Sequence, residues 1–133
     1  MSVKIAWLIV LFLPFMTGCD KDPSAKLVLT RWKLEGIKEK NNWFYTKTEE
    51  NLCLEFGSDS TYQLSLSRND CGGTYFVTDI DHISFGQPHC PLACCDSEYS
   101  LKFASFLPGM RSLSLHSDQL MLEGEVKMIF SKL

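Results

Sequence analysis

Residues 52–66 have the sequence LCLEFGSDSTYQLSL, and this stretch decides the fold. Apolar side chains occupy every second position on both sides of the polar turn at residues 57–60. Successive side chains of a strand point to opposite faces, so each half places its apolar residues on one face. The stretch therefore predicts an antiparallel β-hairpin with one buried face. The alternating residues are Leu52, Leu54 and Phe56 before the turn, and Tyr62, Leu64 and Leu66 after it.

The same alternation recurs in short runs on both sides of this hairpin, with turn residues between the runs. We therefore predict an α+β fold that is mainly antiparallel β, a compact sheet or partial barrel of about eight short strands. One segment departs from the period of two and predicts a single helix at about residues 96–107. The other predicted strands contain Trp32 to Gly36, Tyr75 and Val77, Ile83 and Phe85, Leu113 and Leu115, Leu120 and Leu122, and Val126 to Phe130.

The predicted helix has an apolar stripe and two end signals. Tyr99, Phe103 and Phe106 recur at helical spacing. Asp96 is a residue type that caps a helix N-terminus, and Pro108-Gly109 ends the helix. We expect the stripe to pack across one opening or face of the sheet. A ligand-binding helix is the alternative interpretation, and core packing is favoured.

The N-terminal residues have the pattern of a secretory signal. Lys4 precedes the apolar run IAWLIVLFLPF at residues 5–15. A helix needs about 20 residues to span a bilayer, so this run is too short. Its length and flanks are typical of a cleaved signal peptide. An uncleaved N-terminal anchor is the alternative, which the short run and the cysteine at its border disfavour.

The residues Met16-Thr17-Gly18-Cys19 end the apolar run and resemble the bacterial lipobox, with Met16 where the family prefers Leu. The resemblance implies that residues 1–18 are a lipoprotein signal peptide and that Cys19 is lipidated. Each buried CH₂ of an acyl chain contributes about 0.8 kcal/mol, and two or three chains hold such a protein on its membrane. We predict a lipoprotein of the bacterial cell envelope, with residues 19–25 as the lipidated cysteine and polar tether.

Charge and length limit what the mature protein does. Removal of residues 1–18 deletes one lysine and no acid, so the net charge changes from −3 to −4. An acidic balance argues against nucleic-acid binding, which needs a basic patch. The remaining 115 residues suit one domain, which we place at residues 26–133, after the tether.

Two short patterns behind Cys19 concern its destination. Asp20 resembles the inner-membrane retention residue of enteric lipoproteins, whereas Asp20-Lys21-Asp22 resembles the surface-export signals of Bacteroidetes lipoproteins. We favour the outer membrane, with exposure at the cell surface as one form of this location.

Five cysteines remain in the domain, and an oxidising envelope compartment favours disulfides. An odd number leaves at least one thiol unpaired within a monomer. We predict that Cys71 pairs with Cys90 or Cys94. Such a disulfide closes a loop of about 20 residues and stabilises the fold by about 3 kcal/mol, because it restricts the unfolded chain. A bridge between adjacent Cys94 and Cys95 would strain the peptide and is disfavoured. The disulfide candidates are Cys53, Cys71, Cys90, Cys94 and Cys95.

The segment His89-Cys90-x3-Cys94-Cys95 also permits a zinc site, with Cys53 or Cys71 as a further ligand. Structural zinc sites usually combine two pairs of ligands, and this cluster has no second pair. We therefore predict neither a metal nor a cofactor.

The sequence predicts no enzymatic activity. A free cysteine near His89 would imitate a Cys/His nucleophile, but no Gly-x-Ser-x-Gly elbow, His-Glu-x-x-His motif or phosphate loop occurs. A thiol- or metal-dependent activity is the alternative.

The order of short motifs resembles the META domain, the HslJ-like domain of bacterial envelope and heat-shock-related lipoproteins. The likeness covers about 100 residues, and each motif is short. Two departures are Pro91-Leu92, where the family has Thr-Met, and an insertion at residues 41–51. The resemblance implies the fold and no catalytic residues. The matching pieces are Trp32-Lys33-Leu34, Asn69 to Tyr75, Ile83-Ser84-Phe85-Gly86, Pro91 to Cys95, Glu98 to Leu107, Leu120-Met121-Leu122 and Ile129-Phe130.

The insertion contains three consecutive aromatic residues, Trp43-Phe44-Tyr45. In an extended segment at least one of them points to each face, and exposed apolar surface marks interaction sites. Such aromatic residues are more commonly buried under their own loop. The alternative hypothesis is that they form a surface that binds a partner.

We therefore predict a non-catalytic envelope lipoprotein that binds or protects another envelope component, with a stress-related role as one form of this function. A lipocalin-like carrier of a small apolar ligand is the alternative. The nine phenylalanines of the chain, two of them in the signal, tend to fill the interior and so disfavour a carrier.

Overall fold

The structure is a computed structural model that describes residues 23–91 and 95–133. Its nine strands form one antiparallel sheet in the order β6-β5-β4-β3-β1-β9-β8-β7, and β2 pairs with β1 beside this path. The strands are β1 (Arg31–Lys38), β2 (Thr46–Lys47), β3 (Cys53–Phe56), β4 (Thr61–Ser65), β5 (Asp70–Val77), β6 (Ile83–Phe85), β7 (Met110–His116), β8 (Gln119–Gly124) and β9 (Lys127–Lys132). The helices are the 3₁₀ turns η1 (Pro23–Lys26) and η2 (Leu107–Gly109), and the α-helix α1 (Glu98–Phe106).

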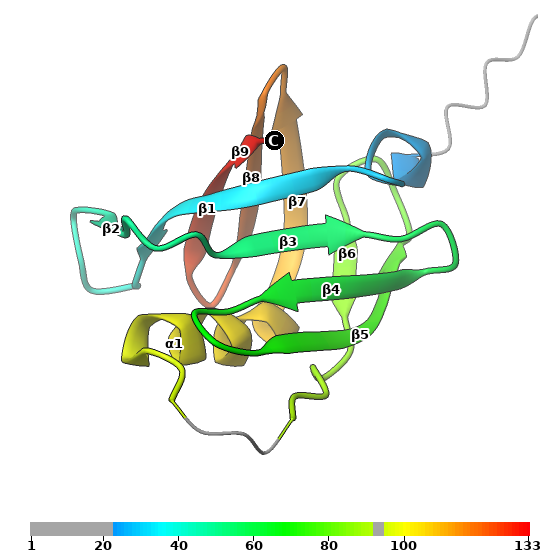
Figure 1. The fold of residues 1–133 in the computed structure, drawn as a ribbon. Helices are drawn as coiled ribbons and strands as arrows, with labels where there is room; N and C mark the ends of the chain where they lie inside the picture. Colours follow the sequence, from blue (N-terminus) through cyan, green and yellow to red (C-terminus); the bar gives the residue numbers. More distant parts are fainter. Residues whose placement is uncertain (1–22, 92–94) are drawn as a thin grey trace, which may run out of the picture.

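The two end strands of the sheet approach each other and nearly close a barrel. A β-bridge joins His82 to Ser112, and the Leu113 N–H donates to the Asp81 carbonyl over 2.9 Å. Figure 1 shows β6 behind the front strands and near β7. The predicted antiparallel partial barrel with one helix is confirmed. The two-residue β2 was not predicted, since residues 41–51 show no alternation.

Large side chains fill the interior of the barrel. The ring of Phe56 lies 4.9 Å from that of Tyr75, edge to face, and the rings of Tyr62 and Phe85 are 5.5 Å apart. Burial of this apolar surface stabilises the fold by about 25 cal/mol per Å². The largest fully buried side chains are Trp32, Tyr62, Phe56, Phe103, Phe130, Leu27, Leu34, Leu52, Leu54, Leu64, Leu107 and Met110.

The helix α1 covers one end of the barrel (Figure 1). Its Phe103 is fully buried, with its ring centre 5.9 Å from that of Phe130 in β9. Core packing of the apolar stripe is therefore what the structure shows. Within the described residues, no helix is both long and apolar enough to cross a membrane.

The predicted helix is confirmed with limits that differ by one or two residues, and the predicted cap is wrong by one residue. The helix begins at Glu98, and the hydroxyl of Ser97 caps it by accepting from the Ser100 N–H over 3.1 Å. It ends at Phe106, where the chain tightens into η2. The carboxylate of Asp96 is engaged elsewhere, on the turn between β4 and β5.

Asp96 holds that turn against the start of α1. Its carboxylate accepts from the backbone N–H groups of Arg68 and Asn69 over 2.7 and 3.0 Å. It also accepts from the Asn69 side-chain amide over 2.7 Å and from the Ser67 hydroxyl over 3.3 Å. We call these four residues the Asp96 clamp. Partial burial alone would raise the pKa of Asp96, but the hydrogen bonds favour the charged form and lower the pKa overall.

Substitution of Asp96 should destabilise the barrel in a pH-dependent way. Asp96→Asn replaces a carboxylate oxygen, which accepts a hydrogen bond from the Asn69 amide, by an amide nitrogen that can only donate. The free energy of unfolding should fall by about 1–2 kcal/mol at neutral pH. The loss is no larger because the group is partly exposed to solvent. A lowered folded pKa gives stability that is fully present above the usual value of 3.8 and lost as the pH falls through the folded pKa. The difference between wild type and variant should therefore shrink in acid.

Urea unfolding at neutral and at acidic pH measures both effects. Asp118→Asn is the matched control, because Asp118 is exposed in the turn before β8. An equal loss for the two variants, or a loss independent of pH, would contradict the clamp.

Candidate functional site

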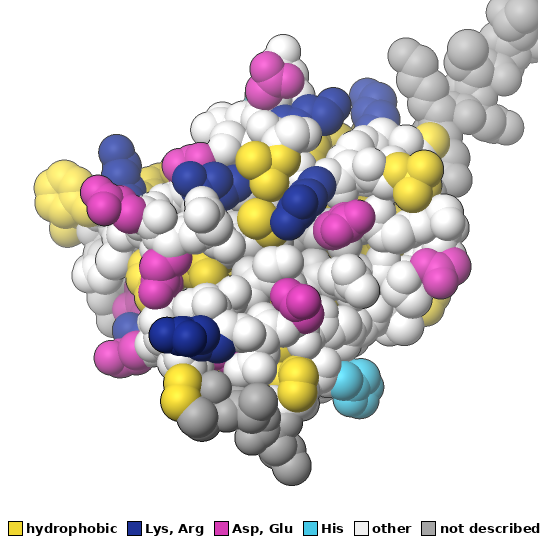
Figure 2. Space-filling model, viewed as in Figure 1, with side chains coloured by type: hydrophobic (Ala, Val, Ile, Leu, Met, Phe, Trp, Pro, Cys, Tyr) yellow, Lys and Arg dark blue, Asp and Glu magenta, His cyan; other side chains and the backbone are white. Residues whose placement is uncertain are grey.

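Among the described residues, the loop between β1 and β2 carries the most exposed aromatic side chains. Trp43 is 89% exposed and Phe44 is 82% exposed. Figure 2 shows hydrophobic side chains protruding at the end of the molecule where this loop lies in Figure 1. The commoner expectation was burial, and the structure exposes both residues. We call Trp43 and Phe44 the aromatic tip.

The loop is supported on its β1 side. Tyr45, the third aromatic residue, is half-buried, and a Cβ placed on Gly36 would lie only 3.2 Å from the Tyr45 Cβ. The glycine thus allows Tyr45 to pack against β1. The Asn42 N–H donates to the Glu39 carbonyl over 3.0 Å and closes the first turn of the loop.

The loop is also held from the helix side. The Tyr99 hydroxyl of α1 donates to the carbonyl of Thr46 in β2. Burial raises the pKa of Tyr99, so this hydroxyl keeps its proton at neutral pH. Farther along, the Ser97 hydroxyl donates to the Glu50 carboxylate over 2.8 Å. The aromatic tip is therefore presented by a loop with fixed ends.

A small hollow of about 160 Å³ lies beside the aromatic tip. The Glu39 carboxylate and the Lys102 ammonium line it and are 3.8 Å apart, and this exposed pair adds little stability. Sequence reasoning did not find this hollow, because three separate segments meet there. The lining residues are Ile37, Glu39, Asn42, Thr46, Tyr99 and Lys102.

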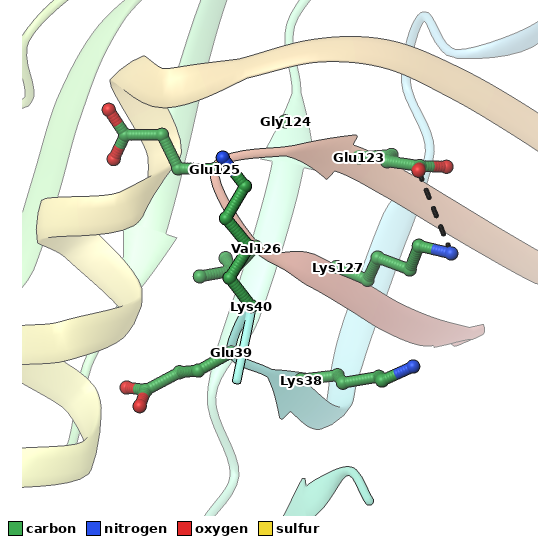
Figure 3. Close-up of a pocket in the computed structure, with 8 residues that line it drawn as sticks. All are labelled: Lys38, Glu39, Lys40, Glu123, Gly124, Glu125, Val126 and Lys127. Atoms are coloured by element: carbon green, nitrogen blue, oxygen red, sulfur yellow. Dashed lines mark ion pairs between the residues drawn. The ribbon is translucent and has the colours of Figure 1, made fainter. Parts of the chain in front are cut away.

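A second hollow of about 180 Å³ lies between the end of β1 and the β8–β9 turn. Lys38, Lys127 and Glu123 face one another across three strands, and Lys127 pairs with Glu123 over 3.6 Å. Figure 3 shows Lys38 and Lys127 extending in the same direction while Glu39 extends the other way. Positively and negatively charged side chains both line this hollow. It is therefore better suited to polar contacts with a larger partner than to binding one small anion.

This end of the barrel has an exposed apolar centre with charged groups of both signs near it. An apolar centre with a polar rim is the arrangement of protein–protein interfaces. Among the residues described, no group of three or more His, Cys, Asp or Glu could hold a metal ion.

A disulfide joins Cys71 to Cys90, which confirms one of the two predicted partners of Cys71. The backbone explains the choice, because Gly72 and His89 form an antiparallel bridge with N–H···O distances of 3.1 and 2.7 Å. Their neighbours Cys71 and Cys90 are thereby placed opposite each other, with Cα atoms 4.4 Å apart.

Of the other disulfide candidates, one is free, one is bonded as predicted and one lies outside the described residues. Cys53, a disulfide candidate, is instead a free and buried thiol. Cys95 is disulfide-bonded. Zinc ligation by Cys71 or Cys90 is excluded while the two form the disulfide. Cys94 and the lipobox residues Met16, Thr17, Gly18 and Cys19 lie outside the described residues.

Comparison with known proteins shows the fold. No family profile and no curated protein sequence matches the chain. An NMR structure of a protein from Burkholderia xenovorans is similar, with a TM-score of 0.63, 15% identity, and coverage of 84% of this chain and 88% of that chain. A crystal structure of a DUF4847 family protein from Bacteroides vulgatus ATCC 8482 has a TM-score of 0.61 and 13% identity, and covers 81% of this chain and 95% of its own. The shared property is the barrel itself.

Loss of the disulfide should cost considerably more than loss of the free thiol. Replacement of both Cys71 and Cys90 by Ser should lower the free energy of unfolding by about 3 kcal/mol, because the unfolded chain regains freedom. Urea unfolding under oxidising conditions gives this value.

Cys53→Ala is the matched control and should change stability less, since it removes only one buried sulfur atom. Equal losses in the two variants would show that the bridge does not constrain the unfolded chain.

Proposed function

We propose that the chain is a cell-envelope lipoprotein anchored through a lipidated Cys19, and that its META-like barrel binds a protein of the envelope through the aromatic tip, without catalysis. The carrying observation is the exposure of Trp43 and Phe44, 89% and 82%, on a loop whose ends are fixed. Protection of that partner under stress is one form of this function.

The direction of β1 supports a partner away from the anchoring membrane. β1 begins shortly after η1, which contains the last residues of the predicted tether, and ends at the loop that carries the aromatic tip (Figure 1). Its eight residues span about 23 Å at about 3.3 Å per step. A lipid on Cys19 would hold the start of the strand near the bilayer, so the aromatic tip would point toward the aqueous space.

The chemistry of the tip supports a protein as the partner. Tryptophan and other aromatic residues dominate binding energy at interfaces when a partner covers them. Around the tip lie charged groups of both signs, among them Glu39, Lys40 and Lys102, which suit a polar rim.

The filled interior makes a carrier the weaker hypothesis. A carrier of an apolar ligand needs an apolar chamber. Phe56, Tyr62 and Phe85 instead pack against each other inside the barrel. The two hollows described near the tip are lined mainly by charged and polar side chains.

The course of the chain supports the META resemblance. The matching motifs fall in sequence on β1, the β4–β5 turn with β5, β6, α1, β8 and β9. The insertion at residues 41–51, which the family lacks, carries the aromatic tip. A partner specific to this chain would therefore be recognised by the part in which it departs from the family.

Truncation of the tip should strongly reduce capture of the partner. The lipidated protein is crosslinked in native envelopes, and its partner is identified by affinity capture and mass spectrometry. The variant Trp43→Ala/Phe44→Ala should recover about tenfold less of this partner than the wild type. The reason is that aromatic anchors buried in an interface contribute about 2 kcal/mol or more. Phe76→Ala is the matched control, because Phe76 is exposed on β5. Equal capture by the two variants would refute the proposed surface.

Cys19→Ser tests the anchor. Metabolic labelling with a palmitate analogue should label the wild type and the Cys53→Ala control, whereas Cys19→Ser should remain unlabelled and keep its signal. Labelled Cys19→Ser protein would show that another residue accepts the lipid.

A further inference from the structure

Two leucines are exposed at the end of the barrel opposite the aromatic tip. Leu29, between η1 and β1, is 78% exposed, and Leu133, after β9, is 62% exposed. Both are fixed to the sheet. The Leu29 N–H donates to the Phe56 carbonyl and the Leu133 N–H donates to the Arg31 carbonyl, each over 2.9 Å. Their side chains therefore protrude from ordered backbone.

Leu29 also has a strained backbone. Its φ of 61° lies in the left-handed region, where the Cβ of a leucine crowds the chain and glycine is the usual residue. The fold thus keeps a leucine where glycine would be less strained, and leaves its side chain in water. Strain of this kind concentrates at functional positions.

Basic side chains accompany the two leucines. Lys26 and Arg31 flank Leu29 in the sequence, Lys132 precedes Leu133, and all three are exposed. Within residues 23–91 and 95–133, none of the three forms an ion pair. Acidic residues lie close to this face as well, because Glu55 is opposite Arg31 in the sheet and the Asp118 carbonyl accepts from the Lys132 N–H over 2.8 Å.

We propose that this end, the tether face formed by Lys26, Leu29, Arg31, Lys132 and Leu133, docks on the surface of the bilayer that holds Cys19. This inference rests on the proposed function. Leucines that enter the interface and lysines that reach anionic headgroups are the chemistry of interfacial binding. Docking fixes the barrel on the membrane and turns the aromatic tip toward the aqueous space.

The length of the tether makes the bilayer the occupant. Cys19 and Pro23 are four residues apart, which is at most about 14 Å of extended chain. The start of β1 therefore cannot move far from the headgroups once Cys19 is acylated. A tethered surface binds at high effective concentration, so two leucines and three cations suffice where a free protein would not stay bound.

Leucine-methyl NMR of the lipidated protein in nanodiscs tests the docking, with a spin-labelled lipid as the probe. The nanodiscs contain phosphatidylcholine alone or with phosphatidylglycerol. We expect the protein to remain with both, and the methyl groups of Leu29 and Leu133 to relax several-fold faster than those of Leu101, which is 53% exposed on α1. The enhancement should be larger with phosphatidylglycerol.

Leu29→Gly separates docking from folding. The substitution relieves the positive φ and keeps the backbone N–H, so thermal stability should be unchanged or higher. The relaxation enhancement of the Leu133 methyl groups should nevertheless fall several-fold. In Lys26→Glu/Lys132→Glu, this relaxation enhancement should depend less on phosphatidylglycerol. Leu29→Ala, which keeps the strain, should lose the enhancement as well.

The outcomes distinguish the two proposals. Protein that stays with the nanodiscs but shows equal relaxation at Leu29, Leu133 and Leu101 overturns the docking and leaves the anchor intact. Protein that leaves phosphatidylcholine nanodiscs refutes the anchor, and the docking falls with it. Enhancement that survives Leu29→Gly unchanged also overturns the tether face.

Discussion

The pairing of β1 with both β3 and β9 is the interaction on which the rest of the molecule depends. β1 lies against β9 from Trp32–Lys132 to Lys38–Lys127, and against β3 from Arg31–Glu55 to Lys33–Cys53. The β1–β9 ladder joins the first strand to the last, and β1 lies in the middle of the sheet order. Because a central strand is hydrogen-bonded on both sides, its direction within the barrel is fixed. The two surfaces that we propose for the membrane and the partner lie at its opposite ends.

Local alternation was enough to predict the strands, and distant partners decided what it missed. Leu52, Leu54 and Phe56 show their buried face in the sequence, since the period of a strand is two. Asp96 and Ser97 are both good capping residues, so sequence alone cannot choose between them. The choice falls to Ser97 because the Asp96 carboxylate finds donors on a turn 27 residues earlier. The choice of Cys90 for Cys71 likewise depends on a backbone bridge that no local pattern announces.

Only part of the candidate site could be predicted from the sequence, for a related reason. The triplet of aromatic residues was visible as a candidate surface, but burial depends on what lies opposite each ring. Tyr45 meets Gly36, which leaves room for it, whereas Trp43 and Phe44 lie beyond the last residue of β1 and remain uncovered. Neither the positive φ nor the exposure of Leu29 could be predicted, because a leucine in a short connection has no sequence pattern that indicates either property.

Single exposed hydrophobic residues are common on protein surfaces and need no explanation. The tip and the tether face differ because each places its apolar side chains on ordered backbone, one beside Tyr45 and the other on hydrogen bonds to the sheet. The buried core consists of other residues, so these side chains take no part in its packing. At Leu29 the position even opposes folding through its backbone. In the arrangement that we propose, one rigid strand couples the two ends: whatever sets the angle of the tether face on the bilayer also sets the direction in which Trp43 and Phe44 are presented.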